Sequence, residues 1–159
     1  PPRSTLFPYT TLFRSEPRFI VLHDIDTPPM GAYWGEVQGN IHKALGAVGV
    51  ATDGTVRDLD EAHALGFRFF AKEVSVSHAY VHLVEIGIPV TVGGLTVKTG
   101  DLLHGDKHGV TSIPFGIADQ IPDKVKTIAD YEKMIIDLCQ SSDFSMEALK
   151  ENAKITRPY

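Results

Sequence analysis

An arginine and an aspartate stand side by side at Arg57 and Asp58, and Glu36 precedes them with twenty residues (37–56) between. A guanidinium can hold an oxo-acid through two parallel hydrogen bonds. A neighbouring carboxylate is a hard oxygen ligand of the kind that Mg²⁺ takes while keeping several waters. Together these groups suit the polarisation of a keto group and the stabilisation of an enolate. The same pair at a turn also forms surface salt bridges and helix caps, and its spacing alone does not separate the two interpretations.

Two strand–helix steps are predicted around this pair. Short apolar runs rich in β-branched residues predict buried strands at 19–22 and 48–51. Helical spacing predicts helices over about 34–45 and 58–65, each ended by a glycine. The order strand–helix–strand–helix predicts a βαβ unit with its helices packed on a sheet.

Three local expectations belong to these elements. Residues 24–31, which include two prolines, are expected to form a loop. The dipeptide Asp53-Gly54 is expected to end the second strand in a turn. The first helix is expected to bury an apolar stripe at i, i+4, i+7 and i+8, made of Val37, Ile41, Ala44 and Leu45.

These elements would place the candidate residues together. Residues 35–38 stand at the N-terminus of the first helix, where unpaired amides and the helix dipole favour an anion such as a carboxylate. Arg57 and Asp58 follow the second strand directly, and ligands of open α/β sheets collect at the carboxyl ends of strands. Both groups are therefore expected to face one crevice.

The second half of the chain changes in character from Phe67 onward. Short strand candidates separated by glycine-containing turns predict a small barrel or folded sheet, at 67–70, 82–86, 90–92, 95–97, 101–103 and 110–113. Apolar residues at helical spacing after Pro122 predict a helix in the tail. Ser145 is a suitable N-cap for a last helix that runs to about Asn152.

Length, charge and cysteine content narrow the class of protein. A chain of 159 residues fits one globular domain, and 15 Lys and Arg against 20 Asp and Glu argue against nucleic acid as the main partner. The single cysteine, Cys139, excludes an intrachain disulfide, favours the cytoplasm, and is expected to be buried. No apolar run approaches the ~20 residues that a membrane span needs.

The first fifteen residues, PPRSTLFPYTTLFRS, differ from the rest of the chain. They repeat Thr-Leu-Phe, contain no acidic residue and lack the continuous apolar core of a signal peptide. The stretch TLFPYTTLFRS resembles a translated sequencing adapter. We therefore expect residues 1–15 to be non-native, with a natural N-terminal part missing.

The stretch GEVQGNIHKALGAVGVATDGTVRDLDEAHALGF, residues 35–67, resembles the RraA-like family. That family includes the regulator of ribonuclease E activity A and the 4-hydroxy-4-methyl-2-oxoglutarate aldolases. Its signature is an acidic residue, twenty residues, Arg-Asp and a further acidic residue three places on. In this sequence those places hold Glu36, Arg57, Asp58 and Glu61.

A second stretch extends the resemblance. The segment IPVTVGGLTVKTGDLLHGDKHGVTSIP, residues 88–114, resembles the later strand pattern of the family. The resemblance covers roughly residues 18–122 and implies an α/β fold of the swivelling β/β/α type. It predicts an RraA-like domain over 16–122, followed by a helical tail over 123–159.

The resemblance implies a divalent-metal-dependent (class II) pyruvate aldolase that also decarboxylates oxaloacetate. In this implication Asp58 ligates Mg²⁺ or Mn²⁺, and Arg57 contacts the pyruvyl oxygens and the developing enolate. Glu36 acts on the metal through water, and Glu61 supports Arg57 or a water. The substrate carboxylate is held by the backbone amides of Gly35, Glu36, Val37 and Gln38.

The resemblance also carries expectations about partners. Family members are typically trimers or hexamers with sites near subunit interfaces, and the small-molecule partner would be a 2-oxo acid of the pyruvate or oxaloacetate type. Because the ribonuclease regulator works by binding a protein, the alternative is a non-catalytic regulator that binds an endoribonuclease.

Three histidines outside the signature suggest other chemistry. The segment SHAYVHLVEIGIPVTVG, residues 77–93, is also similar to a phosphohistidine swivelling domain, in which His78 would carry a phosphoryl group. That motif has a Gly-Gly shortly before Ser-His, and residues 72–76 contain no glycine. His104 and His108 lie four apart near Asp106, but their segment predicts a strand and a solvated turn rather than a helical metal site.

Overall fold

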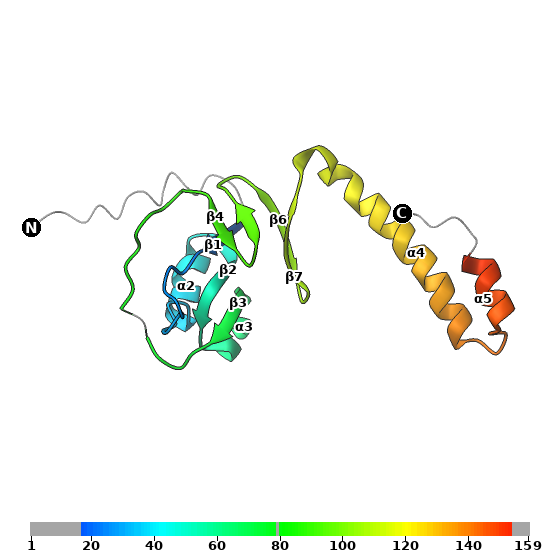
Figure 1. The fold of residues 1–159 in the computed structure, drawn as a ribbon, viewed down its shortest axis with the longest axis horizontal. Helices are drawn as coiled ribbons and strands as arrows, with labels where there is room; N and C mark the ends of the chain where they lie inside the picture. Colours follow the sequence, from blue (N-terminus) through cyan, green and yellow to red (C-terminus); the bar gives the residue numbers. More distant parts are fainter. Residues whose placement is uncertain (1–16, 79, 154–159) are drawn as a thin grey trace, which may run out of the picture. The chain divides into compact units, whose positions relative to one another are not determined.

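The computed structural model of the chain describes residues 17–78 and 80–153, so the expectation for residues 1–15 lies outside the described residues. The chain divides into two compact units, one that ends at Ile113 and one that begins at Pro114. Each unit is described by itself below (Figure 1).

The first unit contains the predicted βαβ arrangement. Its sheet has the order β1-β2-β3, with all strands parallel: β1 (Arg18–Leu22), β2 (Ala47–Val56) and β3 (Arg68–Val74). The crossovers are α2 (Glu36–Ala44) and α3 (Leu59–Leu65). Successive crossovers in one direction place both helices on one face of the sheet, and α2 and α3 do contact each other. The strand predicted at 67–70 belongs to this sheet, not to the β-rich half, because it pairs with β2.

The core forms between this sheet and its helices. Trp34 is 1% exposed and stacks on Phe67 with ring centroids 5.9 Å apart. From α2 the buried residues are Gly39 and His42, so the predicted apolar stripe is wrong. Its four residues are exposed: Val37, Ile41, Ala44 and Leu45. The face is reversed because α2 faces Leu65 and Phe67 at Gly39 and buries His42, which places the apolar stripe on the opposite side.

The Asp53-Gly54 dipeptide lies inside β2 and does not end it. Pairing with β3 shifts between Thr52 and Thr55, where β2 advances three residues and β3 advances two, from Ala71 to Glu73. This one-residue excess is a β-bulge. The turn prediction was wrong because β2 continues through the dipeptide. It pairs with β1 up to Thr52, and with β3 both up to Thr52 and again from Thr55.

Two antiparallel hairpins follow the sheet. One joins β4 (Val90–Val92) to β5 (Leu95–Val97), and the other joins β6 (Leu102–Asp106) to β7 (Gly109–Ile113). They confirm four of the predicted strands, as separate two-stranded sheets. The strand predicted at 82–86 was wrong, since these residues form neither a strand nor a helix. Their apolar character does not produce a strand because no neighbouring strand pairs with them in the described part of the chain.

The second unit is helical, as predicted. A 3₁₀ helix, η1 (Phe115–Gln120), leads into α4 (Ile121–Gln140), and α5 (Met146–Ala153) follows. The Ser145 hydroxyl accepts the Ala148 N–H at 3.0 Å, which confirms it as the N-cap. Cys139 is exposed, so its predicted burial was wrong: the half-buried stripe of α4 runs through its neighbours Ile135 and Leu138. Among the described residues, no helix is both long and apolar enough to cross a membrane.

Candidate functional site

The Arg57–Asp58 pair occupies the junction between β2 and α3. Asp58 precedes α3 in the left-handed conformation, with φ 54° and ψ 50°, and its carbonyl oxygen accepts the Ala62 N–H at 3.0 Å. Aspartate visits this region more readily than most residues, because its short polar side chain forms local hydrogen bonds. The Asp58 carboxylate does not cap α3. It lies instead beside Arg57 and the Glu36 amide.

The N-terminus of α2 is tied to this junction by backbone contacts. Trp34 forms an isolated parallel bridge with Val56, and the Arg57 N–H donates to the Trp34 carbonyl oxygen at 2.9 Å. The next residue of α2 completes the link, because the Glu36 N–H donates to Asp58 Oδ2 at 2.9 Å. Two residues that are 22 positions apart in sequence are thus joined directly, so the helix N-terminus and the Arg-Asp pair lie side by side.

Gly35 makes this approach possible. A Cβ atom on Gly35 would lie 2.5 Å from Asp58 Oδ2 and 2.9 Å from Arg57 Nε. The φ of Gly35 is −160°, an extended value that any residue adopts, so the requirement for glycine is one of space. Any larger residue would separate the carboxylate and guanidinium from the helix.

Several polar atoms of Arg57 and Asp58 form no hydrogen bond with another described residue. Arg57 Nε lies 3.4 Å from Asp58 Oδ2, and the two side chains are 18% and 35% exposed. Among the described residues, neither the terminal nitrogens of Arg57 nor Asp58 Oδ1 has a hydrogen-bond partner. The amides of Val37 and Gln38, in the first turn of α2, likewise have no acceptor within the described ranges. The junction therefore offers donors for an anion next to one free carboxylate oxygen.

Two predicted site residues lie at the edge of this group. Glu36 is exposed, and it is its backbone amide that contacts Asp58. Glu61 is also exposed, on α3, and forms no ion pair or hydrogen bond with Arg57 in the part of the chain that the structure describes. The structure thus joins Gly35, Glu36, Arg57 and Asp58, and it leaves Glu61 outside that group.

The donor set at the junction fits a hard cation with few protein ligands. No cluster of three or more His, Cys, Asp or Glu side chains forms a metal site within residues 17–78 and 80–153. Asp58 offers one unpartnered carboxylate oxygen in a partly exposed position, which leaves room for water ligands. Mg²⁺ is commonly bound by one or two carboxylates and several waters, so the residues present fit it or Mn²⁺.

Two cavities of the first unit lie away from the junction. One is lined by β1, by His42 of α2 and by the segment 80–88, and the other by β2, β3 and the turns of the hairpins. Neither is lined by Arg57 or Asp58. The junction is therefore an open, partly exposed site, and its chemistry comes from its side chains and backbone, not from an enclosing pocket.

A histidine–aspartate pair between the residue after β1 and the interior of β2 was not predicted. His23 Nδ1 lies 2.6 Å from Asp53 Oδ2, and Asp53 Oδ1 accepts the Asp24 N–H at 2.7 Å. The register of β1 with β2, which pairs Leu22 with Thr52, places Asp53 beside His23. The sequence held a partial signal for this pair, since His23 follows the predicted strand 19–22 directly and Asp53 lies two positions after the predicted strand 48–51.

The other histidines have ordinary surroundings. Asp106 pairs with His108 at 3.2 Å and lies 3.8 Å from His104 in the exposed β6–β7 turn, as predicted for a solvated turn. Hydrogen bonds from the His108 amide and ring lower the pKa of Asp106. His78 is exposed and bridges Ala32, and no helix follows it in residues 80–89, unlike the phosphohistidine arrangement.

Comparison with known protein families matches residues 8–111 to a family described as "RraA-like: Aldolase/RraA". The matched range includes the whole parallel sheet, the junction and the β4–β5 hairpin. It also includes part of the segment 1–15.

Two curated proteins are similar to the chain in sequence. One, from Halalkalibacterium halodurans, is named "Putative 4-hydroxy-4-methyl-2-oxoglutarate aldolase" and is 28% identical over 116 residues, 72% of this chain and 55% of its own. The other, an uncharacterized protein of Methanocaldococcus jannaschii, is 34% identical over 105 residues, 65% of this chain and 50% of its own. The chain thus spans about half the length of the curated relatives that it matches.

Solved structures share the fold at low sequence identity. An uncharacterized protein from Pseudomonas syringae pv. tomato aligns with a TM-score of 0.68 at 22% identity, covering 84% of this chain and 62% of its own. Streptomyces coelicolor RraAS2, described as an unusual member of the RNase ES inhibitor RraA family, aligns with a TM-score of 0.62 at 22% identity, covering 80% and 66%. These alignments confirm the predicted fold class.

Proposed function

This chain belongs to the RraA-like family, and we propose that it is a divalent-metal-dependent lyase that releases pyruvate from a 4-hydroxy-2-oxo acid and from oxaloacetate. The relative named as a 4-hydroxy-4-methyl-2-oxoglutarate aldolase supports this class of reaction. The observation that carries the proposal is the hydrogen bond from the Glu36 amide to Asp58, which holds the helix N-terminus against the Arg-Asp pair.

The metal ligand in this proposal is Asp58. Its Oδ2 is held by the Glu36 amide, which leaves Oδ1 to bind Mg²⁺ or Mn²⁺ together with water. When bound, the ion supplies a Lewis acid that polarises the 2-keto group of the substrate. Glu36, exposed at the start of α2, would act through water ligands of the ion.

Substrate binding falls to Arg57 and the first turn of α2. The unpaired amides of Val37 and Gln38 would hold the substrate carboxylate, where the helix dipole also favours an anion. The Arg57 guanidinium would donate to the 2-oxo oxygen. Breaking the C3–C4 bond leaves its electron pair on the pyruvyl fragment as an enolate, while the other fragment leaves as a carbonyl compound whose 4-hydroxyl proton passes to water, or as CO₂ from oxaloacetate. Arg57 would stabilise the charge that develops on the enolate oxygen. Protonation at C3 then gives pyruvate.

The open position of the junction bears on the assembly. Since neither cavity of the unit encloses Arg57 and Asp58, we propose that a second copy of the chain supplies the missing wall in a homo-oligomer, a trimer or hexamer. Glu61, which does not contact Arg57, would then orient water at the edge of the site.

A lyase assay tests the proposal. The purified chain is given oxaloacetate or 4-hydroxy-4-methyl-2-oxoglutarate with Mg²⁺ or Mn²⁺, pyruvate is measured, and protein-free reactions correct for decarboxylation by the metal alone. We expect EDTA to abolish the enzymatic rate, and Asp58→Asn and Arg57→Lys each to lower kcat/KM by about 100-fold or more. Asp60→Asn is the matched control, because Asp60 is exposed on α3 outside the junction. Equal rates with EDTA and with Asp58→Asn would contradict the proposal.

A protein-binding role is the second candidate. Two of the structures with this fold are named as an RNase ES inhibitor family member and as the RNA-processing inhibitor RraA. Absence of lyase turnover, combined with saturable binding to a purified endoribonuclease that Asp58→Asn leaves unchanged, would favour this role over the lyase.

A further inference from the structure

The long helix of the second unit is only partly covered by the short one. α4 has 20 residues and α5 has 8, so they are about 30 Å and about 12 Å long at 1.5 Å per residue. α5 can therefore cover less than half of α4. Within the described residues 114–153, no residue is buried. Helices of folded proteins are stabilised mainly by packing of an apolar face, so α4 needs a further partner.

The apolar residues of α4 follow a seven-residue repeat, and we call them the α4 stripe. Ile121, Ile128 and Ile135 stand at one position of the repeat, and Tyr131 and Leu138 stand three residues after the last two of them. All five are half-buried. These are the a and d positions, along which helices pack in coiled coils and in helix bundles. The stripe extends over nearly the whole of α4, well beyond the reach of α5.

One flank of the stripe is open. Met134, on one side, is half-buried. The other side holds Val125, Glu132 and Cys139 at intervals of seven residues, and all three are exposed. A partner helix would therefore pack on the stripe from this second side, which we call the open flank.

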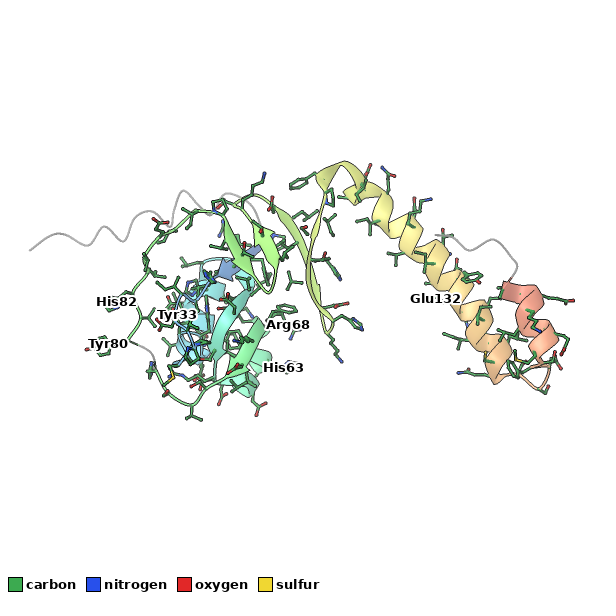
Figure 2. All side chains as sticks on the ribbon, viewed as in Figure 1. Tyr33, His63, Arg68, Tyr80, His82 and Glu132 are labelled. Atoms are coloured by element: carbon green, nitrogen blue, oxygen red, sulfur yellow. The ribbon has the colours of Figure 1, made fainter. Side chains whose placement is uncertain are left out.

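The charges of α4 complement a second copy of the same helix. Its first half, 121–129, has two lysines and one aspartate, and its second half, 130–140, has three acidic residues and one lysine. Lys126 and Lys133 each pair with an aspartate four residues on, within the helix. Lys124, at the remaining d position, and Glu132, near the middle of α4 (Figure 2), form no ion pair with another described residue. They are eight positions apart, about 12 Å along the axis, so they do not pair within one helix.

The direction of the second helix follows from these two unpaired charges. Two parallel copies would place Lys124 against its own counterpart within the stripe, and like charges that face each other are destabilising. Two antiparallel copies instead bring the basic first half of each helix beside the acidic second half of the other. Charge complementarity therefore favours the antiparallel pair.

We propose that α4 packs side by side with α4 of a second copy of the chain, antiparallel and along the open flank. In the register that aligns the two stripes, Ile128 of each copy packs on Tyr131 of the other. Lys124 of each copy then lies beside Glu132 of the other. Each contact occurs twice, because the pair is twofold symmetric.

This contact does not depend on the lyase reaction and is separate from the wall proposed at the junction. A twofold contact makes the number of copies in the assembly even. The chain is a dimer if the α4 contact acts alone, and a hexamer if it joins two trimers. The number of copies thus distinguishes failure of the α4 contact from failure of the assembly proposed at the junction.

Analytical ultracentrifugation of the purified full chain and its variants tests the contact. We expect an even number of copies for wild type. Lys124→Glu should make the assembly separate into halves at a concentration at least about tenfold higher, since two attractions become two repulsions. Combining Lys124→Glu with Glu132→Lys exchanges the charges and should restore the association.

Lys126→Glu is the matched control, because Lys126 lies on the side of α4 opposite the stripe and pairs with Asp130 of its own helix. It should associate as the wild type does. A wild-type chain that stays a monomer or a trimer at submillimolar concentration would overturn the proposal. So would a double variant that associates as weakly as Lys124→Glu alone.

The single cysteine of the chain tests the direction of the pair. Cys139 is exposed and takes a nitroxide label, and electron–electron double resonance measures the distance between labels on the assembled protein. The register places Leu138 opposite Ile121 of the second copy, so the two labels are offset by 19 residues and lie about 30 Å apart. Lys124→Glu should weaken this distance signal at equal protein concentration. Labels within about 15 Å, as expected for parallel helices in contact, would overturn the antiparallel pair.

Discussion

The junction at Arg57 and Asp58 and the segment 80–88 differ in how the chain holds them. The junction is fixed by hydrogen bonds from the Arg57 amide to Trp34, from the Glu36 amide to Asp58, and from the Ala62 amide to Asp58. The segment 80–88 has no backbone hydrogen bond to another described residue. A site for defined chemistry needs groups held in place, and these hydrogen bonds hold the groups of the junction. Residues 80–88 are exposed and lack such bonds, which are the features of a region that opens locally.

The largest expected effect comes from Gly35→Ala, which breaks the fixed region. The added Cβ would meet Asp58 Oδ2 at 2.5 Å and Arg57 Nε at 2.9 Å, so the carboxylate must leave the Glu36 amide. We expect pyruvate release to fall by about 100-fold, as for a misplacement of catalytic groups by about 1 Å. Steady-state kinetics on oxaloacetate measure this.

Gly116→Ala is the matched control, because a Cβ there meets nothing within 4 Å. It should keep the wild-type rate. Wild-type activity in Gly35→Ala would show that the close approach of α2 to Asp58 has no part in the reaction.

The second effect concerns pH, at the boundary between the two regions. Burial lowers the pKa of His42 below its ordinary value of 6.5, so the unfolded chain binds the proton more tightly. The free energy of unfolding should therefore fall as the pH drops below 6.5, and level off once the folded protein is also protonated. One proton gives at most about 1.4 kcal/mol per pH unit.

Urea unfolding between pH 5 and 7.5 measures this effect as the difference between wild type and His42→Phe. Carboxylates contribute equally to both proteins, so they cancel in the difference. Parallel curves for the two proteins would mean that His42 does not titrate with folding.

The smallest effect is expected in the segment 80–88. Val84 is 70% exposed, so Val84→Ser should change the free energy of unfolding by no more than about 0.5 kcal/mol. Thermal unfolding followed by circular dichroism is sufficient to see it. A loss above about 1 kcal/mol would show that the segment packs as firmly as the junction, and the contrast between the regions would fail.

The parallel part of the fold was predictable because its signals are local. The runs at 19–22 and 48–51 and the glycines that end both helices each act through their own neighbours, as does the N-cap at Ser145 in the second unit. The adjacent positions of residues 35–38 and the Arg-Asp pair also followed, since strand ends meet at one edge of a parallel sheet.

The wrong predictions concern features that depend on contacts with segments distant in the sequence. The stripe of α2 has helical spacing, but the contact through Gly39 with Phe67 decides which face is buried. Residues 82–86 have the composition of a strand, but no strand of residues 17–78 and 80–153 pairs with them. The β-bulge at Asp53-Gly54 and the His23–Asp53 pair arise from the register between strands, which periodicity within one strand does not contain.

The β-bulge in β2 determines on which side of the sheet the later side chains of the strand emerge. Side chains alternate between the two sides of a strand, so one additional residue exchanges the sides on which all later side chains emerge. Arg57 and Asp58 follow the bulge by a few positions, and their orientation is counted from it. Pairing β2 with β3 without the bulge, at unchanged strand length, would retain every chemical group of the junction while turning Arg57 toward the opposite side of the sheet. The irregular pairing at this dipeptide, as much as the identity of the charged pair, therefore determines the geometry of the site.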